Sequence, residues 1–432
     1  MQQKITYAGT VSRSFAEGHD LLERLADTAV SVKQVERLTR RIGAERVAER
    51  DALVAAFQAL PLPEKFGVPA GVAAPEVAAV MADGGRLQIL DRAALAPAEP
   101  ATAAAPAATT ETAAAARETW EAEPIPAGHW REDKMALLLT LDSPVSTTDP
   151  CPTLPAAFLD AARMEALARD LSRHVKGPLA DAADPAMAPA AAAAAAPAAP
   201  AAPAAPVYQP PVVQRRQVLA SRQPWPTFAP IVAQAAWAQG FQGARRRAFV
   251  GDGSANHWRL RRRCFGSFVP ILDFIHALSY VYAAATAGRS RVIGWAIYEQ
   301  WITWVWQGRV AEVIVALHDR QAELGMPEAD EPDTSPRAVV ARTLTYLGNQ
   351  RDKMHYDEYR RQGLPITSSL MESTVKQVNR RVKGTEKFWS EAGAEALLQL
   401  RADQLSDDEP LADFWRRREA AATGQRRSRR AA

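Results

Sequence analysis

The chain has 432 residues, 47% of them hydrophobic, and its 52 Lys and Arg against 49 Asp and Glu give a net charge of +3. At roughly 150 residues per domain, this length allows about three domains with ample apolar content for a sizeable core. Two cysteines, Cys151 and Cys264, exclude a disulfide framework and a cysteine-rich zinc site. The N-terminus has no basic segment followed by an apolar one, and apolar runs such as 292–306 are too short to span a bilayer. We therefore expect a soluble protein of a reducing, cytoplasmic compartment.

Residues 14–58 have the periodicity of two packed helices with a break at 28–31. Ser31 is expected to cap the second helix, which leaves Lys33 and Arg37 available to phosphates or base edges. A DNA-binding helix-turn-helix and a plain helical hairpin both fit this pattern. The apolar positions that set the period are Leu21, Leu22, Leu25, Val32, Val35, Leu38 and Ile42.

Asp83 lies in the apolar segment 77–90, which is interrupted by Gly84-Gly85. This pattern predicts a β-hairpin with the two glycines in its turn. Asp83 is then expected at the end of the first strand, beside the turn. Segments rich in Ala and Pro follow at 93–116 and 178–206; they bury too little surface to form a core, so we interpret them as linkers.

Asp252 follows a short apolar segment and is flanked by two glycines, Gly251 and Gly253. A strand that ends in this way places the carboxylate at the rim of a sheet, where missing side chains leave room for a bulky ligand. An ordinary turn has the same sequence. Basic clusters, among them 245–247, are expected to flank the proposed acids, which suits a channel that binds phosphates; solvated surface is the alternative.

Glu372 follows Pro365 and a Ser/Thr cluster, at the point where a helical pattern begins. A single acid near a helix N-terminus suits a metal ligand or a dipole partner, and it is also common in ordinary capping. The same helix face is cationic and suits a polyanion. The residues at three- and four-residue steps from Glu372 are Lys376, Asn379, Arg380 and Lys383.

The long separation between Asp252 and Glu372 indicates an inserted domain, because one strand-to-helix connection needs far fewer residues. Residues 271–323 are helical in pattern and rich in tryptophan. Core packing is the default interpretation of this cluster, and stacking on an unpaired base is the alternative. Together, two strand-borne aspartates and one helix-borne glutamate provide the hard oxygen ligands of a two-magnesium site.

Several motifs make the chain similar to bacterial insertion-sequence transposases of the Kra type, which are relatives of the Mutator superfamily. The similarity covers most of 210–420 in order, and it is weaker upstream. The motifs are Gly251-Asp252-Gly253, 268–278 (FVPILDFIHAL), 363–366 (GLPI), 371–373 (MES), 381–384 (RVKG), 389–390 (WS) and 400–402 (LRA), and upstream 31–37, 83–86 and 130–134.

The resemblance implies an Asp-Asp-Glu enzyme with an RNase H-like core, in which Asp83, Asp252 and Glu372 hold two Mg²⁺ or Mn²⁺ ions. Asp273 and His276 match the Asp/Cys-x-x-His element of that superfamily, which is accessory to the site; a polar pair satisfied inside the core is the alternative. The chain departs from the family at 367–369, Thr-Ser-Ser, where relatives often have Gly-Ser-Gly.

The expected activity is metal-dependent hydrolysis of a phosphodiester at the ends of a DNA element, followed by transfer of the freed 3′-hydroxyl into target DNA. Double-stranded DNA is the expected partner, with a homo-oligomer assembled on it and the protein at the nucleoid when bound. A catalytically silent DNA-binding regulator and a structure-specific nuclease are the alternatives. The residues expected to bind DNA are Lys33, Arg37, Arg245, Arg246, Lys376, Arg380 and Lys383.

The predicted fold class is α/β, with a mostly helical insertion and an N-terminal helical region. The predicted parts are a helical region at 1–65, the first part of the RNase H-like core at 66–270, the insertion at 271–360, the closing part of the core with the Glu372 helix at 361–410, and a basic tail at 411–432.

Overall fold

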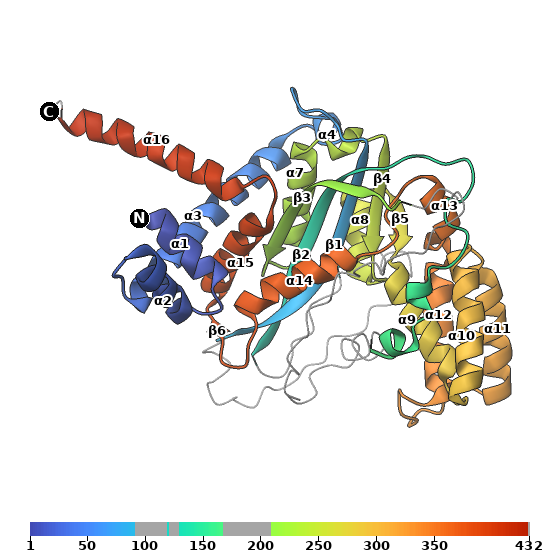
Figure 1. Cartoon of the computed structure of the whole chain (residues 1–432). Coiled ribbons are helices and arrows are strands. Elements are labelled where there is room, and N and C mark those ends of the chain that lie inside the picture. Colours follow the sequence, from blue (N-terminus) through green and yellow to red (C-terminus); the bar gives the residue numbers. More distant parts are fainter. Residues whose placement is uncertain (91–118, 121–128, 167–208, 431–432) are drawn as a thin grey trace, which may run out of the picture. The chain divides into compact units, whose positions relative to one another are not determined.

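The computed structural model describes residues 1–90, 119–120, 129–166 and 209–430 (Figure 1). The two predicted linkers, 93–116 and 178–206, lie outside the described residues. The chain forms two compact units: the first comprises Met1–Ser143, Pro211–Asp273 and Leu364–Ala432, and the second comprises Pro144–Pro210 and Phe274–Gly363.

The first unit is α/β, as expected, and is built on a mixed sheet with the strand order β3-β2-β1-β4-β5. Strand β2 is antiparallel to both of its neighbours, β1 and β3, whereas β4 and β5 run parallel to β1. The short strand β6 pairs with the end of β1. The strands are β1 (Val77–Ile89), β2 (Trp130–Asp142), β3 (Val212–Ser221), β4 (Arg246–Gly251), β5 (Val269–Leu272) and β6 (Phe388–Trp389).

Helices cover both faces of this sheet, which explains why the central strands are apolar without alternation. A Cβ on Gly85 of β1 would meet Asn379 of α14 (Ser369–Val382). A Cβ on Gly251 of β4 would instead meet Trp258 of α8 (Ala255–Cys264). Side chains alternate between the faces along a strand, and by the parallel register Gly251 lies opposite Ala82, so α14 and α8 lie on opposite faces. Figure 1 shows α14 crossing one face, with α8 and α7 (Trp225–Ala238) behind the strands.

The N-terminal segment is helical, which confirms that prediction. It forms α1 (Gln2–Val11), α2 (Phe15–Ala26) and α3 (Val32–Ala59), followed by the short α4 (Leu62–Lys65). Ser31 caps α3 as expected: its hydroxyl accepts from the Gln34 amide at 3.2 Å, and the Gln34 side chain accepts from the Ser31 amide at 2.7 Å.

Helix α3 is held to α15 (Glu391–Leu405) by close approach and by buried ion pairs. Gly43 lies so near the backbone of Ala396 that a Cβ would come within 2.4 Å of its carbonyl oxygen. Arg46 pairs with Asp403 at 2.8 Å and Arg50 with Glu395 at 2.7 Å. The predicted helical region 1–65 is thus packed into the first unit. The last helix, α16 (Pro410–Arg430), contains the predicted basic tail.

The second unit contains the predicted helical insertion and also residues 144–166, which the sequence analysis assigned to the core. Trp301 and Trp306 are buried there, which confirms core packing for these two side chains. Arg360 is fully buried, pairs with Asp149 and lies 4.0 Å from the ring of Trp306. The elements are α9 (Phe274–Thr286), α10 (Arg291–Trp306), α11 (Val310–Leu324), α12 (Pro336–Gln350), α13 (Tyr356–Arg361) and the 3₁₀ turns Ala156–Phe158 and Arg351–Lys353. None of the helices described in either unit combines the length and the hydropathy of a bilayer-spanning segment.

The predicted hairpin at 77–90 is wrong, because Gly84 and Gly85 lie inside one continuous strand, β1. Neither glycine has a positive φ. Their role is close approach: a Cβ on Gly85 would lie 2.9 Å from Asp133 Oδ1 and 3.0 Å from Asn379 Oδ1. The antiparallel partner of β1 is β2, reached through the long segment 91–129 rather than through a two-residue turn.

Gly85→Ala is expected to lower the free energy of unfolding by about 1–3 kcal/mol, because the new methyl group must displace Asp133 or α14. Urea denaturation of the purified protein measures this change. Gly266→Ala is the matched control, since its Cβ would meet its nearest atom at 3.5 Å, and a change within about 0.5 kcal/mol is expected. Equal effects of the two substitutions would contradict the close-approach explanation.

Candidate metal centre

Three aspartates lie at one level of three neighbouring parallel strands: Asp83 lies within β1, Asp252 directly follows β4, and Asp273 directly follows β5. Met81 of β1 is opposite Val250 of β4, which is opposite Ile271 of β5. Two residues further, this register aligns Asp83, Asp252 and Asp273. Between β4 and β5 the ladder continues to that level, because the amide of Asp273 donates to the carbonyl of Gly251 at 2.8 Å. Adjacent strands are about 4.8 Å apart, so the structure brings together two predicted metal ligands and one residue predicted as accessory.

Asp252 follows the last residue of β4, which confirms the predicted end of that strand. Its Oδ1 accepts from the Ser254 amide at 2.8 Å and lies 2.7 Å from His257 Nδ1. The Asp252 side chain is 31% exposed, whereas His257 is nearly buried. The carboxylate therefore faces solvent on one side and is oriented by α8 on the other.

His257 belongs to the site, although the sequence analysis gave it no role. Burial opposes protonation of the imidazole, but the carboxylate of Asp252, with smaller contributions from Asp83 and Glu132, raises the pKa of His257 above its ordinary value. The ring also packs edge-on against Trp225, with a centroid distance of 5.3 Å. Its position in the first turn of a helix directly after Gly251-Asp252-Gly253 is the signal that could have identified it.

Asp273 is fully buried and fixes the start of the helix that carries Glu372. Its Oδ1 accepts from the backbone amide of Ser368, the N-cap of α14, at 2.7 Å. A carboxylate oxygen of Asp273 and one of Glu372 lie within 4.8 Å of each other. Asp273 thus has a defined structural partner and is also within reach of an ion bound by Glu372.

Glu372 lies in the first turn of α14, as predicted, one position beyond that of a capping-box glutamate. Helix α14 runs along β1 in the same direction as the strand. Asn379 lies over Gly85, and further along both elements the side-chain amide of Gln88 donates to the carbonyl of Gly384 at 2.6 Å. Glu372 is nearly two full turns before Asn379 and points to the same side of the helix. Glu372 therefore lies over the same face of the sheet as Asp83 and Gly85, on the side of Gly85 where Asp83 is.

Asp133 is a further acid on this face, directly opposite Gly85 on β2. Its side chain is fully buried, and neither carboxylate oxygen has a hydrogen-bond partner among the described residues. Burial raises the pKa of Asp133 to about 7, with a partial offset from the charges of Arg222 and Lys134. The sequence analysis included Asp133 only in a motif, since no pattern in the sequence shows which strand residues meet α14.

His276 is the third residue of α9 and belongs to the second unit. It is three positions from Asp273 in the sequence, so chain connectivity keeps their Cα atoms within about 11 Å. The accessory role of His276 stays a prediction.

The basic residues predicted to bind DNA divide into two groups. Lys376, Arg380 and Lys383 are exposed on α14, the helix of Glu372. Arg245 and Arg246 instead lie where β4 begins, about 20–23 Å along the strand from Asp252, so they do not flank this acid as expected. Arg246 is engaged by Glu76 and by the Ser143 carbonyl, at 3.3 and 2.7 Å.

On α3, Lys33 is exposed and pairs with Glu36 at 3.0 Å, and Arg37 is exposed one turn further along. These two residues therefore remain accessible to a partner. Their helix is 28 residues long and its inner face packs in the first unit, so the structure supports a helical pair without selecting between helix-turn-helix and hairpin.

The carboxylates fit a hard divalent cation such as Mg²⁺, which prefers a few oxygen ligands and keeps several waters. Asp273 and Glu372 supply two oxygens in reach of each other, and Asp83 and Asp252 lie in the adjacent register positions. No protein-family model and no curated protein sequence matches this chain. The assignment of the site therefore depends on its geometry.

Asp133→Asn is expected to stabilise the protein at neutral and higher pH. The folded carboxyl has a pKa of about 7 and the unfolded one 3.8, so the folded state holds the proton between these values and stability falls as the pH rises through this window. The substitution should raise the free energy of unfolding by up to about 4 kcal/mol near pH 8, and much less near pH 4.

Urea denaturation at the two pH values measures this difference, and the exposed Asp20→Asn serves as the control. A stabilisation by Asp133→Asn that is the same at both pH values would show that the buried carboxyl does not titrate in this range.

Proposed function

We propose that the protein is a DNA transposase of the Asp-Asp-Glu type, which cleaves phosphodiesters at the ends of a DNA element and joins the 3′ ends to target DNA. The alignment of Asp83 and Asp252 on neighbouring parallel strands carries this proposal, because two carboxylates at one level of the sheet suit a shared divalent ion. Glu372 reaches the same region from a helix that follows β1. These are the three acids that the resemblance to Kra-type transposases selects.

The sheet topology supports the finer proposal that the core is RNase H-like. An antiparallel β1-β2-β3 segment extended by parallel β4 and β5 gives the order 3-2-1-4-5, with helices on both faces. The segment Phe274–Gly363 of the second unit lies between β5 and α14, where the sequence predicted an insertion. Asp252 follows the carboxyl end of β4, the region where α/β sheets commonly bind ligands, and Asp83 lies at the same level of β1.

Each residue has a distinct role in the proposed reaction. Asp83, Asp252 and Glu372 bind the ions, and Asp273 holds the first turn of α14 so that Glu372 faces the row of aspartates. Two bound divalent ions would activate the attacking oxygen and stabilise the leaving one. His257 orients the carboxylate of Asp252, and His276 is proposed as accessory.

The exposed cations of α14 support this proposal, because they would hold a DNA backbone beside the acids. Lys376 and Arg380 follow Glu372 by one and two turns on the same helix. Phosphates bound by these side chains lie within about 6–12 Å of Glu372 along the helix axis. Binding and cleavage are therefore expected to depend on different residues of one helix.

Glu372→Gln is expected to reduce Mg²⁺-dependent cleavage of DNA at least about a hundredfold, because it removes a ligand charge without changing size; loss of even an outer-sphere partner costs 10–100-fold. DNA binding should be unchanged. The substrate is DNA with the native sequences that flank the gene, incubated with Mg²⁺ or EDTA and analysed for cleaved and joined ends. Glu64→Gln, an exposed acid on α4, is the control.

Three outcomes of this assay separate the candidate functions. Joined products that need both metal and Glu372 support the transposase. Cleavage without joining indicates a structure-specific nuclease. Binding with neither reaction indicates a catalytically silent regulator.

Arg380→Ala is expected to weaken DNA binding and to reduce the slope of log affinity against log salt concentration by about 0.9, which corresponds to one lost phosphate contact. Fluorescence anisotropy over a series of salt concentrations measures the slope. Lys4→Ala on α1, also an exposed cation, should leave the slope unchanged. An unaltered slope for Arg380→Ala would assign this helix face to bulk solvent.

A further inference from the structure

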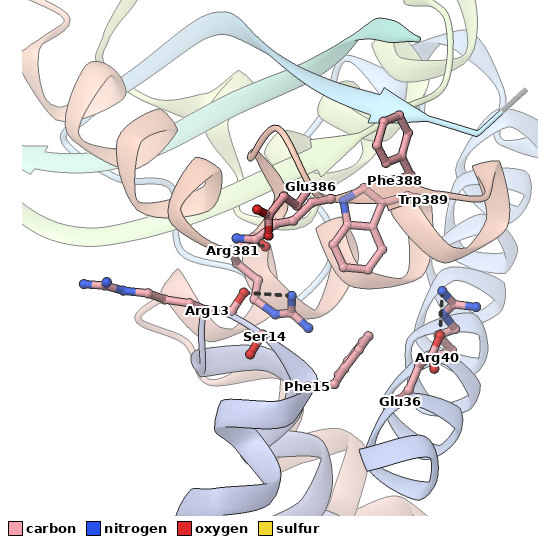
Figure 2. A pocket seen from close by; sticks show the side chains of 10 residues that line it. Arg13, Ser14, Phe15, Glu36, Arg40, Arg381, Glu386, Phe388 and Trp389 are labelled. Atoms are coloured by element: carbon pink, nitrogen blue, oxygen red, sulfur yellow. Dashed lines mark hydrogen bonds and ion pairs between the residues drawn. The ribbon is translucent and has the colours of Figure 1, made fainter. Parts of the chain in front are cut away.

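Two consecutive arginines lie on different sides of α14 near its C-terminal end. Arg381 is buried and donates to the carbonyl of Gly9 at 2.9 and 3.0 Å. Figure 2, which shows the pocket that Arg381 lines, has this side chain reaching toward the start of α2, where it also donates to the Arg13 carbonyl at 3.4 Å. Arg380 is exposed. Arg381 therefore holds the N-terminal helices to α14, whereas Arg380 is available to a partner.

A third arginine, Arg401 of α15, lies beside this pair. It is half-buried, and its guanidinium donates to the carbonyl of Gln377 on α14 at 3.3 Å. Burial, and after it the charge of Arg380, lowers the pKa of Arg401. Burial, and after it the charge of Arg401, lowers the pKa of Arg381 to about 10. Arg401 is thus close to both arginines and lies over the turn of α14 that precedes them.

The charges of Arg380 and Arg401 are not balanced by acids. Among the described residues, neither side chain forms an ion pair with a carboxylate. Helix α15 does provide an acid on another side, where Asp403 pairs with Arg46 at 2.8 Å. Two neighbouring guanidiniums without a counter-charge repel each other, so an anion placed between them would relieve an electrostatic cost that the protein by itself retains.

The chemistry of the two side chains favours a phosphate as this anion. A guanidinium presents a planar fork of donors that matches phosphate oxygens, and one phosphate has enough oxygens to accept from two forks. The bond from Arg401 to the Gln377 carbonyl fixes one fork in advance, which lowers the entropic cost of binding. Arg380 is exposed and adjusts to the ligand.

The position along α14 relates this pair to the proposed site of cleavage. Gln377 and Arg380 follow Glu372 by five and eight positions, which is about 8–12 Å along the helix axis. At about 3.4 Å per nucleotide of one strand, this distance corresponds to roughly two to four nucleotides. A phosphate held here belongs to the same DNA end as the phosphodiester beside the acids.

We propose that Arg380 and Arg401 together bind a single phosphate of the DNA backbone, two to four nucleotides from the phosphodiester that is cleaved. This inference rests on the proposed function, because it adds Arg401 to the DNA-binding surface and specifies how it acts with Arg380. The contact needs both side chains: the anchored fork of Arg401 positions the phosphate, and Arg380 closes on it from the solvent side.

The test is a double-mutant cycle on DNA with the native flanking sequences, with affinity measured by fluorescence anisotropy over a series of salt concentrations. Arg380→Ala and Arg401→Gln should each reduce the slope of log affinity against log salt concentration by about 0.9, which corresponds to one phosphate contact. The double variant should also lose only about 0.9, because both substitutions remove the same contact. At a fixed salt concentration, all three variants should bind about tenfold more weakly than the wild type.

Arg401→Lys separates the charge of this residue from its structural role. It should keep nearly the wild-type slope, because an ammonium group still neutralises the phosphate. Arg247→Gln is the matched control: Arg247 is also half-buried, donates to the Gln242 carbonyl at 2.7 Å and has no ion pair within the described part of the chain. It lies opposite Ala78, about 17 Å along the sheet from the level of Asp83, and its loss should leave the slope unchanged. Urea denaturation verifies that each variant folds.

The results distinguish this inference from the proposed function. A loss of about 1.8 in the slope of the double variant would show that the two arginines bind separate phosphates. An unchanged slope for Arg401→Gln would show that this residue only holds α15 to α14. Either result overturns the shared phosphate, while Mg²⁺-dependent cleavage and joining by the wild-type protein leave the transposase proposal standing. If the wild-type protein binds no DNA, the proposed function itself is overturned.

Discussion

The hydrogen bond between the buried carboxylate of Asp273 and the backbone amide of Ser368 is the constraint on which the candidate site depends. It joins the end of β5 to the first turn of α14 across 95 positions of sequence. A charge-assisted bond in a buried environment is stronger than a neutral one and leaves little freedom of orientation. Because Glu372 lies one turn further along the helix, this bond determines which side of the sheet the glutamate approaches.

Close backbone approach provides the second constraint. Gly85 allows Asp133 and Asn379 to occupy the space of a side chain, and Gly43 does the same where α3 meets α15. Both contacts bring a helix nearer to its neighbour than any larger residue would permit. As a result, α14 lies along β1 from the level of Asp83 to Gln88, and the N-terminal helices are joined to the same unit.

The basic residues have two different physical roles, and burial separates them. Arg46, Arg50 and Arg381 are buried and bind carboxylates, backbone carbonyls or aromatic rings, so they hold elements of the first unit together. Lys376 and Arg380 are exposed and keep their donors available to a partner. A count of charges does not distinguish the two groups, which explains why clusters that look alike in the sequence differ in the structure.

The sequence by itself determined the elements whose signals are local. The helical pair with its Ser31 cap, the strand that ends before Asp252, the helix that begins before Glu372 and the helical segment after residue 271 all follow from periodicity, glycine placement and capping residues. Only the tertiary structure decided that Gly84 and Gly85 lie inside a strand, that Asp273 aligns with Asp83 and Asp252, and that His257 contacts Asp252. The physical reason is that strand register and helix approach arise from contacts between residues far apart in the chain, and no local pattern records them.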